Sequence, residues 1–537
     1  MYNHHQDDIF NSMQSPEFYP HPVRRIEQRD THISKVFLTG DYVYKIKKPV
    51  NLGFLDFTTL EKRRHFCWQE VVLNRRLTKN VYLDMVAITF HKGQYVLSGP
   101  GEAVEYAVKM RQLPEQCSML RLIRDGRLSY DAVDSLARFL SQFYAMASTT
   151  ERINHFGSWE TVQANCEENF HQTAAFVGHI LDDQKYQIIR AATRAFLRRH
   201  KWLFTHRIEQ NKIRDCHGDL RAGHIYFKDG IQILDCIEFN DRFRYSDITA
   251  DLSFLAMDLD FEGHWKIADQ FIEAYVRYTR DKDVLVLLDF YKCYRAFVRV
   301  KVNCFQLQEN NLKAINKDKL LKETRRYLSL AYRYAVQFAR PTLWVVCGMP
   351  ASGKSTIAKE LGRTLDIGVV ESDAVRKALF RIKPHISVDV PFETGIYSRA
   401  GSSLTYGKLL IAAQEVLEKG DSIILAATFS RKHQRQEALR LARDMDVNIF
   451  FIQCVASDEV LKERLKLREH KSSLSDARLH HFDEFKRRFE PLTEVPEDIH
   501  VRINTEKPLE DSMETILSHE HFMLSKMLSN SADASSM

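Results

Sequence analysis

The sequence predicts two domains of different class: an α+β domain, followed by an α/β domain with a parallel sheet. The chain has 537 residues, too many for one hydrophobic core of ordinary size. Before Arg340-Pro341, β-rich segments are followed by long helical runs, and Pro341 interrupts the last of them. After it, short apolar strands alternate with helices, which indicates a helix-covered parallel sheet. The predicted parts are an arm at 1–30, a first domain at 31–337, a second domain at 341–520 and a disordered tail at 521–537.

Composition excludes several classes of protein. A hydrophobic fraction of 44% and a charged fraction of 28% are typical of a folded globular chain. No apolar run approaches the roughly 18 residues that a membrane span needs, and the polar start does not resemble a signal peptide. A net charge of +6 is mild for this length, so nucleic acid is an unlikely partner. The nine dispersed cysteines include no CxxC pair, which favours reduced thiols in a cytoplasmic protein. The oligomeric state stays open.

In the first domain, β-rich and helical segments follow one another. Residues 36–48 predict a hairpin around Thr39-Gly40-Asp41, and residues 57–77 predict an amphipathic helix. Further strands are expected at 86–89 and 105–110, helices at about 129–210, a second β island at 225–237, and helices again at 245–340.

In the second domain, the expected strands and helices alternate. Strands are predicted at 343–347, 422–426 and 448–455, with helices at 355–365, 404–419, 431–444 and 457–468.

A phosphate-binding motif follows the first of these strands. The segment fits the pattern GxxxxGK[ST] with an apolar strand before it and a helix after it, and it comprises Gly348, Met349, Pro350, Ala351, Ser352, Gly353, Lys354, Ser355 and Thr356. Its glycines let backbone N–H groups surround phosphate oxygens at a helix N-terminus. Lys354 can bridge the β- and γ-phosphates, and the Ser355 hydroxyl can bind Mg²⁺. We therefore expect a nucleoside triphosphate, ATP in the first instance, together with Mg²⁺.

Further site candidates follow the P-loop. Asp373 ends an apolar strand and is suited to accept the proton of a substrate hydroxyl, with a possible part in binding Mg²⁺; the alternative is a helix N-cap. Arg464, with Arg468 on the same helix, is a candidate for stabilising transition-state charge, and a solvated basic helix face is the alternative.

The segments VVCGMPASGKST, ESDAVRKALF, IILAATFSRKHQR and RLKLR resemble small P-loop kinases that phosphorylate metabolite or polynucleotide hydroxyls. The resemblance covers 341–505. The family often has an acidic residue where this chain has Ala426, so the resemblance leaves Asp373 as the main acidic candidate.

The first domain carries a second motif, Asp215-Cys-His217-Gly218-Asp219-Leu220. It resembles the catalytic loop of the aminoglycoside phosphotransferases, which have a bilobal, protein-kinase-like fold. The resemblance implies that Asp219 orients and deprotonates the acceptor hydroxyl. It also implies that Asp235, in the later segment ILDCIEFN, binds Mg²⁺.

The same resemblance extends upstream, over about 30–335. Lys45 resembles the phosphate-pairing lysine, with Lys47 as a rival on the same strand face, and Glu70 would be its ion-pair partner. The segments TGDYVYKIKKPVNLGFLDF and DCIEFN resemble a bacterial branch in which such a domain is fused to a P-loop kinase domain. Two departures stand out: His224 replaces the family's metal-binding Asn, and the upstream hairpin has Gly40 as its only glycine.

Together these observations predict an ATP-dependent phosphotransferase that acts on the hydroxyl of a small molecule not identified by the sequence. One alternative is an ATP-regulated binding or scaffold protein with a degenerate N-terminal domain. Another is a polynucleotide end kinase.

Overall fold

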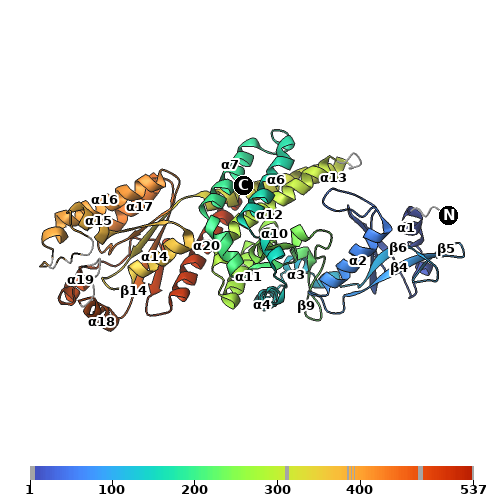
Figure 1. The fold of residues 1–537 in the computed structure, drawn as a ribbon, viewed down its shortest axis with the longest axis horizontal. Coiled ribbons are helices and arrows are strands. Elements are labelled where there is room, and N and C mark those ends of the chain that lie inside the picture. Colours follow the sequence, from blue (N-terminus) through green and yellow to red (C-terminus); the bar gives the residue numbers. More distant parts are fainter. Residues whose placement is uncertain are drawn as a thin grey trace. The chain divides into compact units, whose positions relative to one another are not determined.

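The computed structural model describes residues 6–308, 314–383, 386, 388, 390–391, 393–469 and 476–534. Its contacts divide the chain into two compact units, Met1–Glu167 with Trp202–Thr279, and Glu168–Lys201 with Arg280–Met537. The ribbon in Figure 1 is coloured along the chain, so each unit can be followed separately. The boundary predicted near Pro341 lies inside the second unit, which also holds the two long helices that precede it. The two units therefore do not coincide with the predicted domains 31–337 and 341–520, whose limits stay a prediction.

The first unit begins with a six-stranded antiparallel sheet in the order β1-β2-β3-β6-β4-β5. Alternate residues of β3 face opposite sides, and Tyr44 and Ile46 are buried in a core with Phe37. Helix α2 packs against β4 and β6 of this sheet. The elements are α1 (Gln6–Ser12), β1 (Glu27–Asp30), β2 (Ser34–Leu38), β3 (Tyr42–Lys47), α2 (Leu60–Asn74), β4 (Tyr82–His91), β5 (Gln94–Leu97) and β6 (Ala103–Arg111).

The rest of the first unit is mainly helical. Helix α4 packs against α11, and α10 is buried along most of its length. Two short antiparallel pairs, β7 with β10 and β8 with β9, hold the loops between the helices. The elements are α3 (Met119–Arg124), α4 (Tyr130–Met146), α5 (Glu151–His155), α6 (Trp159–Thr173, which continues into the second unit), α8 (Lys201–Glu209), β7 (Ile213–Asp215), η4 (Ala222–His224), β8 (Ile225–Phe227), β9 (Ile231–Ile233), α9 (Asp241–Arg244), β10 (Tyr245–Asp247), α10 (Ile248–Phe261) and α11 (Trp265–Thr279).

The second unit contains a five-stranded sheet in the order β12-β13-β11-β14-β15, and all its strand pairs are parallel. Leu343 and Val345 alternate onto one face of β11 and pack with buried residues of α16 and α17. Trp344 points to the opposite face and stacks on Phe450. The elements are β11 (Thr342–Cys347), α14 (Lys354–Leu365), β12 (Gly368–Glu371), α15 (Ser372–Leu379), α16 (Arg399–Leu417), β13 (Ile423–Ala426), α17 (Lys432–Asp444), β14 (Asn448–Val455), α18 (Asp458–Glu469), α19 (Phe482–Arg488), β15 (His500–Asn504) and α20 (Leu509–Ala534). The predicted fold class of both parts is confirmed.

Three further helices belong to the second unit: α7 (Asp183–Arg199), α12 (Asp283–Leu307) and α13 (Ala314–Ala339). Their aromatic side chains form one packed group, in which Phe196 of α7 stacks on Phe290 of α12 and meets Phe338 of α13 edge-on. Phe196 and Phe290 are buried in the core of this unit.

Both ends of the chain differ from the prediction. The expected arm contains α1, whose Ile9 and Phe10 are buried against the first sheet, so apolar contact orders it. The expected tail at 521–537 is helical as far as Ala534, because α20 continues through it with Leu524 nearly buried. No helix in the described part of the chain combines the length and the apolar character that crossing a membrane requires.

Candidate functional sites

The predicted P-loop connects β11 to α14 at the carboxyl end of the parallel sheet. Gly348 has φ +139°, and a Cβ added there would lie 2.3 Å from the carbonyl oxygen of Cys454. Gly353 caps α14 with φ +85°. The loop therefore needs glycine at both positions, since L residues rarely adopt these conformations and neighbouring backbone leaves no room at the first. This geometry exposes backbone N–H groups at a helix N-terminus, which is a phosphate-binding arrangement.

The two polar side chains of the motif already have partners. Lys354 Nζ donates to the carbonyl oxygen of Met349 at 2.8 Å, and burial lowers the pKa of this ammonium to about 8. Ser355 Oγ donates to Glu371 Oε2 at 2.7 Å. The serine hydroxyl and a carboxylate thus lie together where a P-loop holds its metal, a donor set that fits Mg²⁺.

Glu371 is a site residue that the sequence analysis did not select. It ends β12 and pairs in register with Ala426 of β13, the position where an acidic residue was expected. The neighbouring strand therefore supplies the carboxylate that Ala426 lacks. The signal was present in the sequence, because Glu371 directly follows two valines of an apolar strand, but only strand order shows which neighbour it has.

Asp373 lies in the first turn of α15, and the N-cap of that helix is Glu371. The N-cap alternative for Asp373 is therefore wrong. Its Oδ1 accepts a hydrogen bond of 3.0 Å from Arg376, whose guanidinium also lies 4.5 Å from the ring centre of Tyr397. Asp373 is thus held at one side of the phosphate site by a buried, positioned arginine.

The two arginines of α18 have different surroundings. Arg464 donates to Thr505 Oγ1 at 3.0 Å and to the Thr505 carbonyl oxygen at 2.8 Å, and more weakly to the P-loop carbonyl of Ala351. Arg468 lines the cavity beside the P-loop, where burial lowers the pKa of its guanidinium and Asp373 opposes that effect. Neither arginine therefore belongs to a solvated helix face. Arg464 connects loops, whereas Arg468 is the arginine directed at the site.

These groups line one cavity of about 360 Å³. Its walls include the P-loop residues and the acidic and basic side chains described above, namely Lys354, Ser355, Glu371, Asp373, Arg376 and Arg468. The volume is in the range of small-molecule binding sites.

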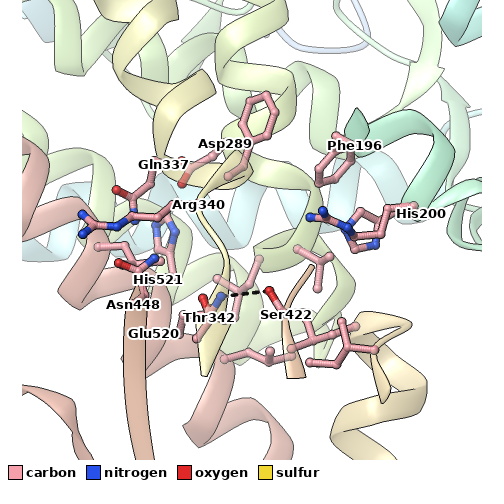
Figure 2. A pocket seen from close by; sticks show the side chains of 18 of the residues that line it. Phe196, His200, Asp289, Gln337, Arg340, Thr342, Ser422, Asn448, Glu520 and His521 are labelled. Carbon is pink, nitrogen blue, oxygen red and sulfur yellow. Dashed lines mark hydrogen bonds between the residues drawn. The ribbon is translucent and has the colours of Figure 1, made fainter. Parts of the chain in front are cut away.

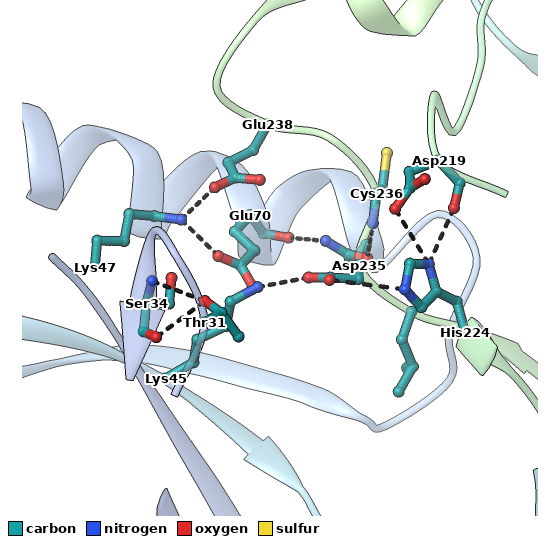
Figure 3. A network of polar contacts seen from close by, with 12 residues as sticks. Thr31, Ser34, Lys45, Lys47, Glu70, Asp219, His224, Asp235, Cys236 and Glu238 are labelled. Carbon is teal, nitrogen blue, oxygen red and sulfur yellow. Dashed lines mark hydrogen bonds and ion pairs between the residues drawn. The ribbon is translucent and has the colours of Figure 1, made fainter. Parts of the chain in front are cut away.

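In the first unit, the predicted lysine and glutamate meet in a polar network centred on the buried Glu70 (Figure 3). Lys45 Nζ lies 2.9 Å from Glu70 Oε1 and 2.5 Å from Asp235 Oδ1, and Lys47 Nζ lies 2.7 Å from Glu70 Oε2. Lys47 also pairs with Glu238, a residue that the sequence analysis did not select. Both lysines therefore reach Glu70, but Lys45 is the one that reaches the metal candidate Asp235. The Asp235 side chain is about half exposed, and the neighbouring Lys45 ammonium holds the pKa of its carboxyl below the usual range.

The loop that carries Asp219 is anchored by a buried carboxylate on α10. The Asp251 oxygens accept hydrogen bonds of 2.8 Å from the backbone N–H groups of His217 and Gly218, and one of 2.9 Å from the Tyr144 hydroxyl. Gly218 has φ +89°, and a Cβ there would lie 2.8 Å from the Phe243 carbonyl oxygen. This anchoring fixes the backbone immediately before Asp219.

Asp219 itself is held by Arg221, whose Nε and one terminal nitrogen each donate to a carboxylate oxygen at 3.0 Å. His224 lies beside them, and burial, with help from Arg221, lowers the pKa of its imidazole to about 4. The structure thus brings together Lys45, Glu70, Asp219 and Asp235, and adds Arg221 to the set. Sequence proximity to Asp219 was the available signal for Arg221.

No group of three or more His, Cys, Asp or Glu side chains in the described part of the chain could hold a metal ion by itself. A site of this kind still fits Mg²⁺, which is usually bound through one or two carboxylates together with substrate phosphates and water.

A second cavity, of about 110 Å³, lies in the second unit at the amino ends of the strands (Figure 2). The N–H of Thr342, the first residue of β11, donates a hydrogen bond of 2.9 Å to Oγ of Ser422, which directly precedes β13. Burial raises the pKa of the lining Glu520 to about 8, with Asp289 adding to the effect, and lowers that of His200 to about 3. The cavity lies at the opposite ends of the strands from the P-loop, and in such sheets ligands bind at the carboxyl ends.

Comparison with known proteins supplies the family. An uncharacterized protein of Mycobacterium tuberculosis, Rv2004c, is 31% identical to this chain over 452 residues, which cover 83% of this chain and 88% of the relative. A Mycobacterium bovis protein, Mb2027c, matches to the same extent. The chain belongs to the family of these mycobacterial proteins. Residues 343–492 of the chain also match the family model described as an AAA domain, which agrees with the predicted P-loop domain.

Three solved structures align with parts of this chain. Aminoglycoside 2'-phosphotransferase-IIIa is 14% identical, with 60% of this chain and 98% of that chain covered, at a TM-score of 0.37. A choline/ethanolamine kinase family protein of Mesorhizobium loti is 12% identical, with 61% and 98% covered, at a TM-score of 0.36. A gluconokinase of Sinorhizobium meliloti is 18% identical, with 36% and 98% covered, at a TM-score of 0.26.

Proposed function

We propose that the protein is an ATP-dependent phosphotransferase that transfers the γ-phosphoryl group of Mg·ATP to a hydroxyl of a small molecule. The observation that carries the proposal is the P-loop site of the second unit. There, a glycine-dependent phosphate loop, Lys354 and a Ser355–Glu371 pair surround a cavity that also contains Asp373. Phosphoryl transfer consists mainly of positioning and charge neutralisation, and this set of groups can supply both.

Each group at the P-loop site has a role that its position supports. The backbone of the loop and Lys354 bind the β- and γ-phosphates, while Ser355 and Glu371 hold Mg²⁺. The acceptor oxygen attacks the γ-phosphorus, the bond to the bridging β–γ oxygen breaks, and ADP leaves. Asp373 accepts the proton of the acceptor hydroxyl, and Arg468 stabilises the charge that develops on the transferred group.

A second site of the same reaction type would lie in the first unit. Asp219 would receive the acceptor proton, Asp235 would bind Mg²⁺, and Lys45, aligned by Glu70, would pair with the phosphates. The support is the set of contacts that joins these residues from four separate segments. The identity of each acceptor, the cytoplasmic location and the absence of a nucleic-acid partner stay predictions.

The test is Mg²⁺-dependent ATP binding and turnover by wild type, Lys354→Ala and Asp219→Ala. Lys408→Ala and Asp131→Ala are matched controls, because both side chains are on exposed helix positions outside the two sites. We expect each site variant to remove a separable part of the activity, and both controls to match wild type. Unchanged nucleotide binding and turnover in Lys354→Ala would refute the proposal for the P-loop site.

A binding or scaffold role for the first unit is the main competing function. It is favoured by the way Arg221 occupies both oxygens of Asp219. If Lys354→Ala abolishes all turnover and Asp219→Ala changes none of it, the first unit is a binding module and the two-site proposal fails.

A further inference from the structure

His224 lies between the two carboxylates of the first-unit site, where the resembling family has Asn. Its Nδ1 is 3.9 Å from Asp219 Oδ2, and its Nε2 is 4.0 Å from Asp235 Oδ2. Figure 3 shows the ring directed at both residues. The roles predicted for Asp235 and Asp219 do not require an imidazole between them, so the His224 ring has no role yet.

The backbone fixes which nitrogen of the ring is available. Nδ1 lies 3.0 Å from the carbonyl oxygen of Asp219, which can only accept, so Nδ1 carries the proton. The lone pair of the neutral ring is therefore on Nε2, which faces Asp235. The main chain of His224 is also held, because its carbonyl oxygen accepts from the N–H of Leu234 at 2.9 Å. A histidine that donates one N–H to a carbonyl and presents its other nitrogen has the orientation of a metal ligand.

The backbone of Asp235 is also held in place. It has φ +66°, a conformation that an L residue keeps only when its surroundings impose it, and its N–H donates to the Tyr82 hydroxyl at 3.1 Å. Two ligands that are each about 2.1 Å from one ion lie no more than about 4.2 Å apart. The 4.0 Å between Nε2 and Oδ2 is therefore compatible with a single ion bound by both.

Two cationic side chains of the site now contact these ligands. Lys45 lies 2.5 Å from Asp235, and a terminal nitrogen of Arg221 lies 3.2 Å from His224 Nε2. The phosphate oxygens of a nucleotide would attract both side chains away, and would add the oxygen ligands that two protein groups alone do not provide. An ion is therefore expected to bind together with the nucleotide.

We propose that His224 Nε2 and Asp235 bind a divalent transition-metal ion, with Mn²⁺ as the probe, that enters with a nucleoside triphosphate and is preferred there over Mg²⁺. Imidazole nitrogen is a good ligand for transition metals, whereas Mg²⁺ selects oxygen. The inference rests on the proposed nucleotide-binding function of the first unit.

The experiment uses the full chain with Lys354→Ala, so that nucleotide binding at the P-loop is suppressed. Mn²⁺ is added with the β,γ-methylene analogue of ATP, which places no nitrogen near the phosphates, and pulsed electron paramagnetic resonance detects nitrogen bound to the ion. We expect a histidine nitrogen coupling that disappears when His224→Asn is added. The preference for Mn²⁺ over Mg²⁺ should fall by about tenfold or more. His91→Asn is the matched control, because this histidine is exposed in the same unit, and it should leave both readouts unchanged.

The possible failures can be told apart. If Mn²⁺ and Mg²⁺ support equal nucleotide binding and no nitrogen coupling is seen, the metal inference fails and the proposed function of the first unit stands. If Lys354→Ala binds no metal–nucleotide complex, both fail. Retained Mg²⁺-supported binding in the His224→Asn variant shows that the variant is folded. A nitrogen coupling that survives in that variant overturns the assignment to His224.

Discussion

The two candidate sites reach a similar chemistry through different kinds of structure. The P-loop site is mostly local: nine consecutive residues, Gly348 to Thr356, supply the phosphate-binding backbone, and the helix that follows supplies the lysine and serine. The first-unit site is assembled from Lys45, Glu70, Asp219 and Asp235, which come from distant segments. Its side chains neutralise one another in the resting structure, through Lys45 with Asp235 and Arg221 with Asp219. A site built from backbone needs little tertiary support, whereas a site built from paired charges depends on every element that carries them.

The largest effect is expected for Gly348→Ala at the P-loop. The added methyl group would collide with the Cys454 carbonyl at a backbone conformation that alanine rarely adopts. The loop must shift to relieve this collision, and we expect ATP to bind the shifted loop roughly a hundredfold more weakly, a loss of about 3 kcal/mol. Isothermal titration calorimetry measures the loss. Gly407→Ala is the control, since this helical glycine has open space around it, and should be neutral or slightly stabilising.

The reverse experiment is Asp251→Ala, which should damage the first unit and spare the second. The variant leaves the Tyr144 hydroxyl and the backbone N–H groups of His217 and Gly218 without their buried acceptor. We expect about 3 kcal/mol or more of lost stability for the first unit. Differential scanning calorimetry with and without ATP should show that the transition stabilised through the P-loop is retained. Loss of P-loop nucleotide binding would contradict the independence of the two sites.

Glu371→Gln tests whether this carboxylate serves the metal of the P-loop site. If this carboxylate replaces the acidic group missing at Ala426, the variant should need about tenfold more Mg²⁺ for half-maximal turnover. A Mg²⁺ titration of turnover tests this, with the exposed Glu415→Gln as control. An unchanged Mg²⁺ requirement would leave Asp373 as the acidic group of the site.

The arginines of α18 should separate stability from turnover. Arg464→Ala removes charged hydrogen bonds to Thr505, and should lower stability by about 1–3 kcal/mol. Arg468→Ala should lower kcat by about tenfold or more, at an unchanged Tm, because its guanidinium faces the cavity. Thermal unfolding and steady-state kinetics on both variants distinguish the roles. A fall in kcat limited to the Arg464→Ala variant would reverse the assignment.

The smallest effect concerns the cavity at the amino ends of the strands in the second unit. The pKa of Glu520 is about 8, above the ordinary value of 4.5, so its contribution to stability is complete below about pH 4.5 and is lost as pH rises through 8. Glu520→Gln, which cannot ionise, should therefore show a smaller decrease of Tm between pH 5 and 9 than wild type. Thermal unfolding across this range is the measurement, with Glu415→Gln as control. An identical pH dependence would show that Glu520 ionises normally.

Much of the fold could be predicted because its signals are local. The apolar strands of the second unit, the P-loop and the hairpin that carries Lys45 all lie within short windows, and their helices repeat apolar residues on one face. The chain ends were misjudged because their order comes from contacts: α1 packs on a sheet, and α20 continues with Leu524 nearly buried. Low local hydrophobicity does not reveal such contacts.

The sequence by itself determined the phosphate loop, the motif around Asp219 and the residue types of both candidate sites, because neighbouring residues set backbone conformation and motif spacing. Only the tertiary structure decided which side chains meet. Strand order placed Glu371 beside Ala426 and next to Ser355. Loop packing gave Arg464 a contact with Thr505, whereas Arg468 on the same helix lines the cavity. The same packing turned His224 towards Asp235. Such choices depend on side-chain distances between remote segments, which a linear pattern does not encode.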